Sequence, residues 1–168
     1  MSKLFLTLFG IILTILLITS PFNNAQAQSA GSVITQTTAP TEGRSADLAE
    51  AARLNSKAVE LFSQARYDEA LPMAQRALEI RGKYLRPDDN LVLTSQFNLA
   101  EILFAKKKYG DALALYKSLL SSYEQTIGPN DSRIAPVMDR LAFIYYERGE
   151  FDKTEASYKR ALAIVERT

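Results

Sequence analysis

Apolar positions divide the chain into three segments of different kinds. Residues 4–18 form an uninterrupted apolar run, and residues 28–44 are rich in Ser, Thr and Gln and show no apolar periodicity. From residue 45 onward, apolar residues recur every three or four positions, the spacing that places them on one face of an α-helix. The pattern therefore predicts an all-α domain over residues 45–168, preceded by two segments of another character.

Six amphipathic stretches make up the third segment, and short turns join them in pairs. We expect helices over residues 46–65, 69–84, 91–107, 111–126, 133–148 and 153–166. Asp68 and Asp152 stand where a carboxylate could cap the second helix of a pair, and Gly149 stands where a helix could end in the left-handed conformation. These stretches predict three antiparallel helical hairpins.

The three hairpins are copies of one pattern, because a shift of 42 residues aligns them without a gap. The shift superimposes an aromatic residue at each turn and a small residue in each first helix: Tyr67, Tyr109 and Phe151, and Ala58, Ala100 and Ala142. An alanine lets two helices approach closely, while the ring fills the end of the hairpin. Repeats of this length are typical of helical solenoids, in which each unit buries its apolar face against the next.

The first segment has the layout of a secretory signal peptide. Lys3 precedes the apolar run, and the small-residue triplet Ala25-Gln26-Ala27 follows it. We therefore predict a signal peptide over residues 1–27, a flexible linker over residues 28–44, and an exported protein that is periplasmic or secreted. An uncleaved leader that tethers the protein to a membrane is the alternative, although residues 4–18 are fewer than the roughly 20 needed to span a bilayer.

Composition removes several classes of function. The 20 Lys and Arg residues face 19 Asp and Glu residues, and only Lys3 of the basic residues lies in the leader, so the chain lacks the basic excess of a nucleic-acid-binding protein. Cysteine and histidine are both absent, which excludes thiolate nucleophiles, imidazole bases and the usual zinc sites. We therefore expect no catalytic residues, no cofactor and no metal.

At these positions the chain resembles the tetratricopeptide repeat family, which carries a small residue in the first helix, an aromatic and an acidic-Ala pair at the turn, and Ala-Leu in the second helix. The match rests on Ala100, Tyr109, Asp111-Ala112 and Arg160-Ala161-Leu162. The 42-residue period and the loop at residues 128–131 are similar to the kinesin light chain subtype. The resemblance covers residues 45–168 and implies a right-handed superhelical solenoid of three antiparallel helix pairs. Lys57 departs from the pattern, since Leu99 and Leu141 occupy the equivalent positions.

In that family the first helices line a concave groove that holds an extended peptide or a partner helix. The resemblance implies these groove positions: Asn55, Val59, Phe62, Phe97, Asn98, Glu101, Phe104, Asp139, Arg140, Phe143, Tyr146 and Glu147. Rings beside carboxylates favour an apolar or basic segment as the ligand. We expect Phe97 and Tyr146 to face the groove, whereas Phe104 and Phe143 could equally fill the core.

Some family members clamp a free C-terminal carboxylate with Lys and Asn side chains, and this clamp is not reproduced. Asn98 matches the Asn position, but Ser56 and Arg140 occupy its equivalents. The Lys position holds Ala52, Thr94 and Pro136. We therefore expect no strong preference for free carboxylate tails.

A second candidate surface lies on the last helix, where Tyr158, Ala161, Leu162 and Val165 would be near an open end of the solenoid. Solenoid ends usually carry a polar cap, and none is evident here. These four residues could form a self-association edge, which would make the protein a homo-oligomer.

Together these observations predict an exported, non-catalytic module that binds a protein or peptide, without nucleic acid and without membrane attachment once the leader is cleaved. A structural scaffold or assembly factor of an envelope or secretion complex is the alternative, which the sequence does not separate from peptide binding. An enzyme based on Glu101, Asp139 and Glu147 is a third possibility. It has little support, because no Gly-rich phosphate loop, G-x-S-x-G turn or metal-ligand pattern accompanies these carboxylates.

Overall fold

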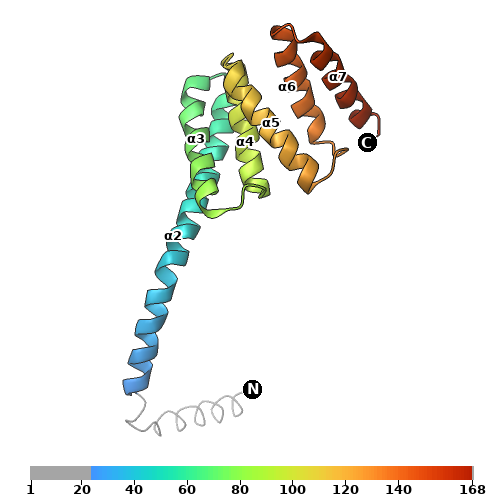
Figure 1. The fold of residues 1–168 in the computed structure, drawn as a ribbon. Helices are drawn as coiled ribbons and strands as arrows, with labels where there is room; N and C mark the ends of the chain where they lie inside the picture. The colour runs from blue at the N-terminus through green and yellow to red at the C-terminus, as the bar shows by residue number, and fades with distance from the viewer. Residues whose placement is uncertain (1–23, 168) are drawn as a thin grey trace, which may run out of the picture. The chain divides into compact units, whose positions relative to one another are not determined.

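The computed structural model describes residues 24–167, which form helices joined by short turns and contain no strand (Figure 1). The helices are α2 (Asn24–Ser63), α3 (Tyr67–Tyr84), α4 (Asn90–Ala105), α5 (Tyr109–Thr126), α6 (Ile134–Glu147) and α7 (Phe151–Val165). The predicted all-α fold is confirmed, and from Ser63 onward every helix begins or ends within two residues of its predicted limit. Residues 1–23, which hold most of the predicted signal peptide, lie outside the described residues.

The first helix begins earlier than the sequence predicts. We expected its start at residue 46 and a flexible linker over residues 28–44, whereas α2 runs through this segment from Asn24. Apolar periodicity detects a helix by its buried face, so it misses a helical segment that has no apolar stripe. A helix that is already formed at one end also extends without a new nucleation step. Among the described residues no helix, α2 included, is long and apolar enough to cross a bilayer.

The chain divides into two compact units, residues 1–43 and residues 44–168, and the second unit contains the helix pairs. Consecutive helices from α3 to α7 lie side by side and antiparallel (Figure 1). Alanines at the contacts between helices are fully buried, as close helix approach requires: Ala51, Ala58, Ala70, Ala74, Ala77, Ala100, Ala112 and Ala142. The predicted pairs are thus α2 with α3, α4 with α5, and α6 with α7.

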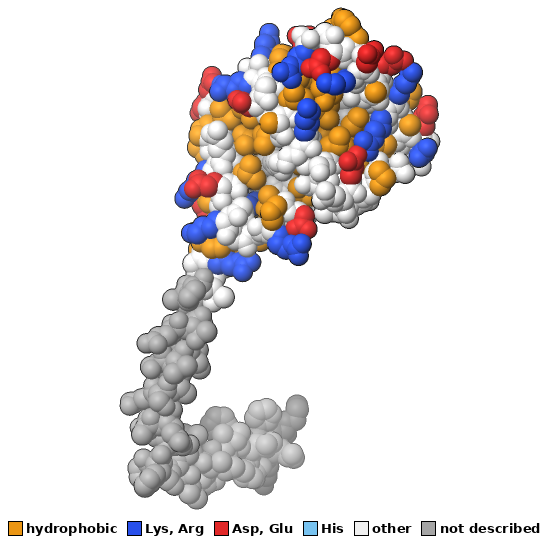
Figure 2. Space-filling view, viewed as in Figure 1, with side chains coloured by type: hydrophobic (Ala, Val, Ile, Leu, Met, Phe, Trp, Pro, Cys, Tyr) orange, Lys and Arg blue, Asp and Glu red, His pale blue; other side chains and the backbone are white. Residues whose placement is uncertain are grey.

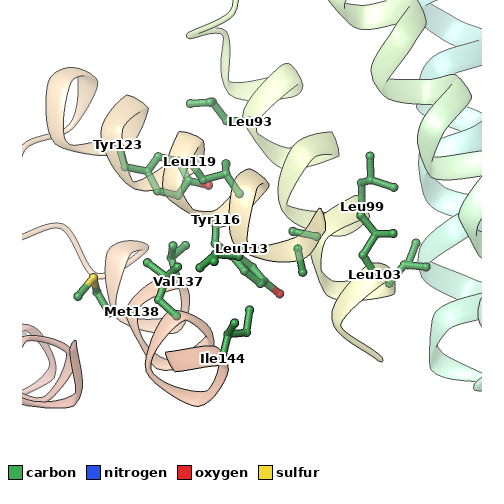
Figure 3. Packing of buried hydrophobic residues seen from close by; sticks show 14 of the residues in the cluster. Leu93, Leu99, Leu103, Leu113, Tyr116, Leu119, Tyr123, Val137, Met138 and Ile144 are labelled. Carbon is green, nitrogen blue, oxygen red and sulfur yellow. The ribbon is translucent and has the colours of Figure 1, made fainter. Parts of the chain in front are cut away.

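One apolar core runs through the helix pairs, from Ala58 on α2 to Ile164 on α7. Figure 3 shows its centre, where Leu113 and Tyr116 of α5 point toward Val137 and Ile144 of α6. Tyr116, Val137 and Ile144 are fully buried. The second and third pairs therefore share their apolar side chains and form one packed body.

The expected helix caps at Asp68 and Asp152 are wrong. Because α3 and α7 begin one residue earlier than these aspartates, each carboxylate lies inside the first turn and accepts no capping hydrogen bond. Among the first helices of the pairs, α4 has a side-chain cap, and a similar hydrogen bond forms just before α6. The Asp89 side chain accepts from the Leu91 N–H at 2.8 Å, and Asp131, at the equivalent position 42 residues later, accepts from the Arg133 N–H at 3.0 Å.

The turn at Asp131 is reinforced by the side chain of Arg133, two residues later. The Arg133 guanidinium binds both oxygens of the Asp131 carboxylate, at 2.9 and 3.1 Å. These side-chain bonds, together with the Arg133 backbone N–H, lower the pKa of Asp131 to about 2. Asp131 therefore stays ionised, and its negative charge lies close to the positive N-terminal end of α6.

Each hairpin turn contains one residue with a positive φ, and the three residues are 42 positions apart. Gly149 has φ of 73°, as predicted for a helix end, while Ala65 and Lys107 have φ of 57° and 58°. A left-handed backbone costs a residue with a Cβ roughly 1–2 kcal/mol, whereas glycine adopts it freely. Only the third turn has the residue type that its conformation favours.

We therefore expect Ala65→Gly and Lys107→Gly each to raise the free energy of unfolding by about 0.5–1 kcal/mol, the relief of strain being partly offset by the greater entropy of glycine in the unfolded chain. Urea denaturation measures the change. Gly149→Ala is the matched control and should lower stability by about 1 kcal/mol. A Cβ at position 149 meets nothing within 4 Å, so the loss would come from the backbone alone. Destabilisation by both glycine variants would contradict the interpretation.

Candidate protein-interaction groove

The first helices of the pairs, α2, α4 and α6, carry the groove residues predicted from the sequence. A cavity of about 220 Å³ lies between α2 and α4. Its lining includes five of the predicted residues together with two more from the same helices: Val59, Phe62, Phe97, Asn98 and Glu101, with Ala58 and Ile102. Because all of these except Asn98 and Glu101 are apolar, the cavity offers a mainly apolar surface.

A second and smaller cavity, of about 150 Å³, lies between α4 and α6. Phe97 of α4, Tyr123 of α5, and Arg133 and Pro136 at the start of α6 line it. Since Phe97 also lines the first cavity, this ring lies midway along the face that α2, α4 and α6 share. The Phe97 ring is half-buried and contacts the Tyr116 ring edge-on, with centroids 6.4 Å apart.

The two predicted asparagines bind each other. The Asn98 amide donates to Asn55 Oδ1 at 3.0 Å, which links α4 to α2. Ser95 Oγ lies 3.4 Å from the same Asn55 oxygen and accepts from Arg81 Nη1 at 2.6 Å. Arg81 is buried, which lowers its pKa, and it also donates to the Leu91 carbonyl at 2.8 Å. This network holds the first pair to the second and orients both amides at the edge of the cavity.

Glu101 is not the solvated groove charge that its position in the sequence suggests. Arg140 of α6 binds both of its carboxylate oxygens, at 2.9 and 3.1 Å, and the Tyr116 hydroxyl donates to it at 2.6 Å. The Glu101 side chain is only 16% exposed. The hydrogen bond to Glu101 raises the pKa of Arg140. Burial of the Tyr116 hydroxyl, together with its hydrogen bond to the Glu101 carboxylate, raises the pKa of Tyr116. The expected acidic flank is therefore reduced to Asp139 and Glu147, which are exposed on α6.

Phe104 and Phe143 pack between the second and third pairs. Their ring centroids lie 5.1 Å apart, and the Tyr109 ring contacts both, at 5.5 and 5.9 Å. The Arg140 guanidinium stacks over Phe104 at 4.9 Å, a cation–π contact. Tyr146 has a different environment, since it is exposed and contacts only the ring of Phe151, at 6.0 Å, among the described rings. Phe104 and Phe143 thus join the pairs, whereas Tyr146 lies at the outer end.

Several residues on the face shared by α2, α4 and α6 were not predicted from the sequence. Tyr116, Tyr123 and Arg133 lie outside the first-helix positions that the family resemblance implies, so the resemblance contains no signal for them. From the sequence we assigned Ala58 to helix packing and did not single out Ile102, although both residues line the first cavity. The repeat period alone could have indicated Tyr116, because Tyr158 occupies the same position one repeat later.

The four residues of the predicted self-association edge lie together on α7. They line a hollow of about 570 Å³ together with three residues from α6: Tyr158, Ala161, Leu162 and Val165, with Ala135, Pro136 and Asp139. Tyr158, Leu162 and Val165 are exposed, and Ala161 is half-buried. On the face drawn in Figure 2, charges of both signs are interspersed around orange patches, without a large field of one sign.

Comparisons with known proteins agree with this geometry. Two family models, both described as tetratricopeptide repeat, match residues 47–125 and 137–168, together about two-thirds of the chain. The TPR domain of Arabidopsis FLU superposes with a TM-score of 0.65 at 19% identity, over 73% of this chain and 99% of that domain. A search of curated proteins finds no match to the sequence.

Two longer solved structures are also similar. BtubC (BKLC) from P. vanneervenii has a TM-score of 0.65 at 25% identity, over 70% of this chain and 46% of BtubC. A chain described as a kinesin light chain of Podosopora anserina, with nearly identical TPR-like repeats, has a TM-score of 0.60 at 20% identity, over 67% of this chain and 53% of its own length. The present chain therefore spans about half the length of these two structures.

Proposed function

Because the chain belongs to the tetratricopeptide repeat family, whose domains mediate protein–protein interactions and are typically not catalytic, we propose that it is an exported module that holds a segment of a partner protein against α2, α4 and α6. Export is supported by Lys3, the apolar run at residues 4–18 and the Ala25-Gln26-Ala27 triplet. The partner would then be a secreted or membrane-associated protein.

The cavity between α2 and α4 carries this proposal. Its volume of about 220 Å³ is below the roughly 300–1,000 Å³ typical of small-molecule sites. It suits one large apolar side chain of a peptide or helix better than a free ligand. Val59, which is 46% exposed, and the half-buried rings of Phe62 and Phe97 would contact that side chain. Apolar anchors of this kind dominate the energetics of protein interfaces.

Charge would play a smaller part in recognition than the sequence suggested. The Glu101 carboxylate is already bound by Arg140 and Tyr116, so it offers little attraction to a basic ligand. Asp139 and Glu147 are exposed on α6 and could attract a cation further along the segment. We therefore infer an apolar anchor in the cavity between α2 and α4, with any basic residue toward α6.

Val59→Asp tests this proposal. A carboxylate in the apolar cavity should weaken capture of the partner at least about 30-fold, the equivalent of the roughly 2 kcal/mol that defines an interface hot spot. The protein would be recovered with its partner from its native compartment, and binding of the identified partner would then be measured by calorimetry. In the same preparation, an N-terminus at Gln28 would agree with export and cleavage after Ala27.

Leu91→Asp is the matched control. Leu91 is also on a first helix and 47% exposed, and it lines none of the cavities described above. The Leu91→Asp substitution should leave the affinity for the partner protein unchanged. Full affinity of a folded Val59→Asp variant would reject the groove as the binding site, whatever the partner.

A further inference from the structure

The outer face of the third pair repeats a surface that the first two pairs bury. At the position of Tyr158, the earlier pairs have Ala74 and Tyr116, which are both fully buried. At the position of Val165 they have Arg81 and Tyr123, which the following pair covers. Arg81 binds Leu91 and Ser95 of α4, and Tyr123 lies under Arg133, the residue before α6. Tyr158 and Val165 are instead 43% and 60% exposed.

The aromatic pair at the hairpin end shows the same contrast. Phe62 with Tyr67 and Phe104 with Tyr109 form equivalent ring pairs, with centroids 5.4 and 5.5 Å apart. Phe143 of the following pair packs on both Phe104 and Tyr109. The third such pair, Tyr146 with Phe151, is 58% and 64% exposed.

These positions define an open stacking face, made of Tyr146, Phe151, Tyr158, Leu162 and Val165. It holds five of the seven large hydrophobic side chains that are exposed among the described residues. Its four residues on α7 lie at i, i+7, i+11 and i+14, a spacing that places them along one stripe of the helix. The apolar exposure of the protein is therefore concentrated on the surface that, in the repeat, packs against a neighbouring helix pair.

The opposite end of the solenoid could not cover this face. In α6 the positions that pack against the preceding pair are Ile134, Val137, Leu141 and Ile144, all nearly inaccessible. The equivalent positions of α2 are Glu50, Arg53, Lys57 and Glu60. They are exposed and form two ion pairs, Glu50 with Arg53 at 2.7 Å and Lys57 with Glu60 at 2.8 Å. Head-to-tail stacking of two copies would bury these four charges against apolar side chains, which is unfavourable.

We propose that the open stacking face packs against the same face of a second copy, forming a closed dimer with two-fold symmetry. Burial of its five side chains would remove about 500 Å² of exposed surface per copy. Two copies would thus bury about 1,000 Å², which is the lower limit for a specific interface. Beside the stripe, Glu155 and Lys159 are paired at 2.5 Å, so the approaching helices carry both signs of charge. This dimer does not depend on ligand binding in the groove.

Sedimentation of the full chain tests the dimer. At about 100 µM the protein should sediment as two copies and no more, because an isologous contact closes on itself. Leu162→Glu and Phe151→Glu each place a carboxylate in the open stacking face and should sediment as one copy. Leu91→Glu, an equally exposed apolar position outside the face, should remain a dimer. Thermal unfolding would show that all four proteins are folded.

Three results would overturn the proposal. If the wild-type chain sediments as one copy, the open stacking face does not bind a second copy, and a helix of another protein would be its partner. A species that grows beyond two copies with concentration would indicate head-to-tail association. A dimer that persists in both carboxylate variants would place the contact elsewhere on the molecule.

Discussion

Tyr116→Ala should lower the free energy of unfolding by about 4 kcal/mol, within the roughly 3–5 kcal/mol that truncation of a buried aromatic residue costs. The Tyr116 ring is fully buried and contacts the rings of Phe97 and Phe104 edge-on, at 6.4 and 6.5 Å. Its hydroxyl donates to Glu101 at 2.6 Å. Truncation would therefore leave a cavity between the second and third pairs and remove a donor from a mostly buried carboxylate. Urea denaturation followed by circular dichroism measures the loss.

The repeat supplies a matched control for this substitution. Tyr158 is the same residue at the same repeat position, but it is 43% exposed and none of the described helices packs over it as α6 packs over Tyr116. Tyr158→Ala should lower the free energy of unfolding by about 1 kcal/mol or less, measured at a protein concentration well below that at which the proposed dimer would form. Tyr116→Phe keeps the ring and should lower the free energy of unfolding by about 1.5–3 kcal/mol, the contribution of a hydrogen bond to a charged group. Equal losses for the two alanine variants would show that the α5–α6 contact does not bury Tyr116 as described.

Arg140→Ala should lower the free energy of unfolding by about 2 kcal/mol. Breaking a fully buried ion pair costs roughly 3–5 kcal/mol, but the Arg140 side chain is 36% exposed, so solvent reduces the loss. The substitution removes two hydrogen bonds to Glu101 and the stacking of the guanidinium on Phe104. Glu101 would keep only the Tyr116 hydroxyl among the donors in the described structure. The free energy of unfolding, again from urea denaturation, reports the loss.

Arg53→Ala is the corresponding control at the surface. Arg53 also forms a bidentate pair, with Glu50 at 2.7 and 2.8 Å, but both side chains are exposed and lie on one helix. Its loss should leave the free energy of unfolding almost unchanged, because solvent screens an exposed pair. A double-mutant cycle between Arg140 and Glu101 should show strong coupling, and a coupling energy near zero would contradict a role for this pair in joining the helix pairs.

The sequence by itself determined the helices, their pairing and the repeat. These properties are local, because an apolar stripe at helical spacing and a turn residue such as Gly149 act within a few residues of chain. For the same reason the sequence located the first-helix face, including Val59 and Phe97, although not the binding activity proposed for it. The continuation of α2 to Asn24 escaped prediction because that segment has no apolar stripe to reveal it.

Only the tertiary structure decided which members of an equivalent set are buried. Tyr116 and Tyr158 share one repeat position, yet one is fully buried and the other exposed, because a following pair covers only the first. The sequence predicted that Glu101 is a charge in the groove, whereas in the structure it is bound by Arg140, 39 residues away. Burial and charge pairing depend on which distant residues meet, whereas a repeat pattern records only what each unit holds in common.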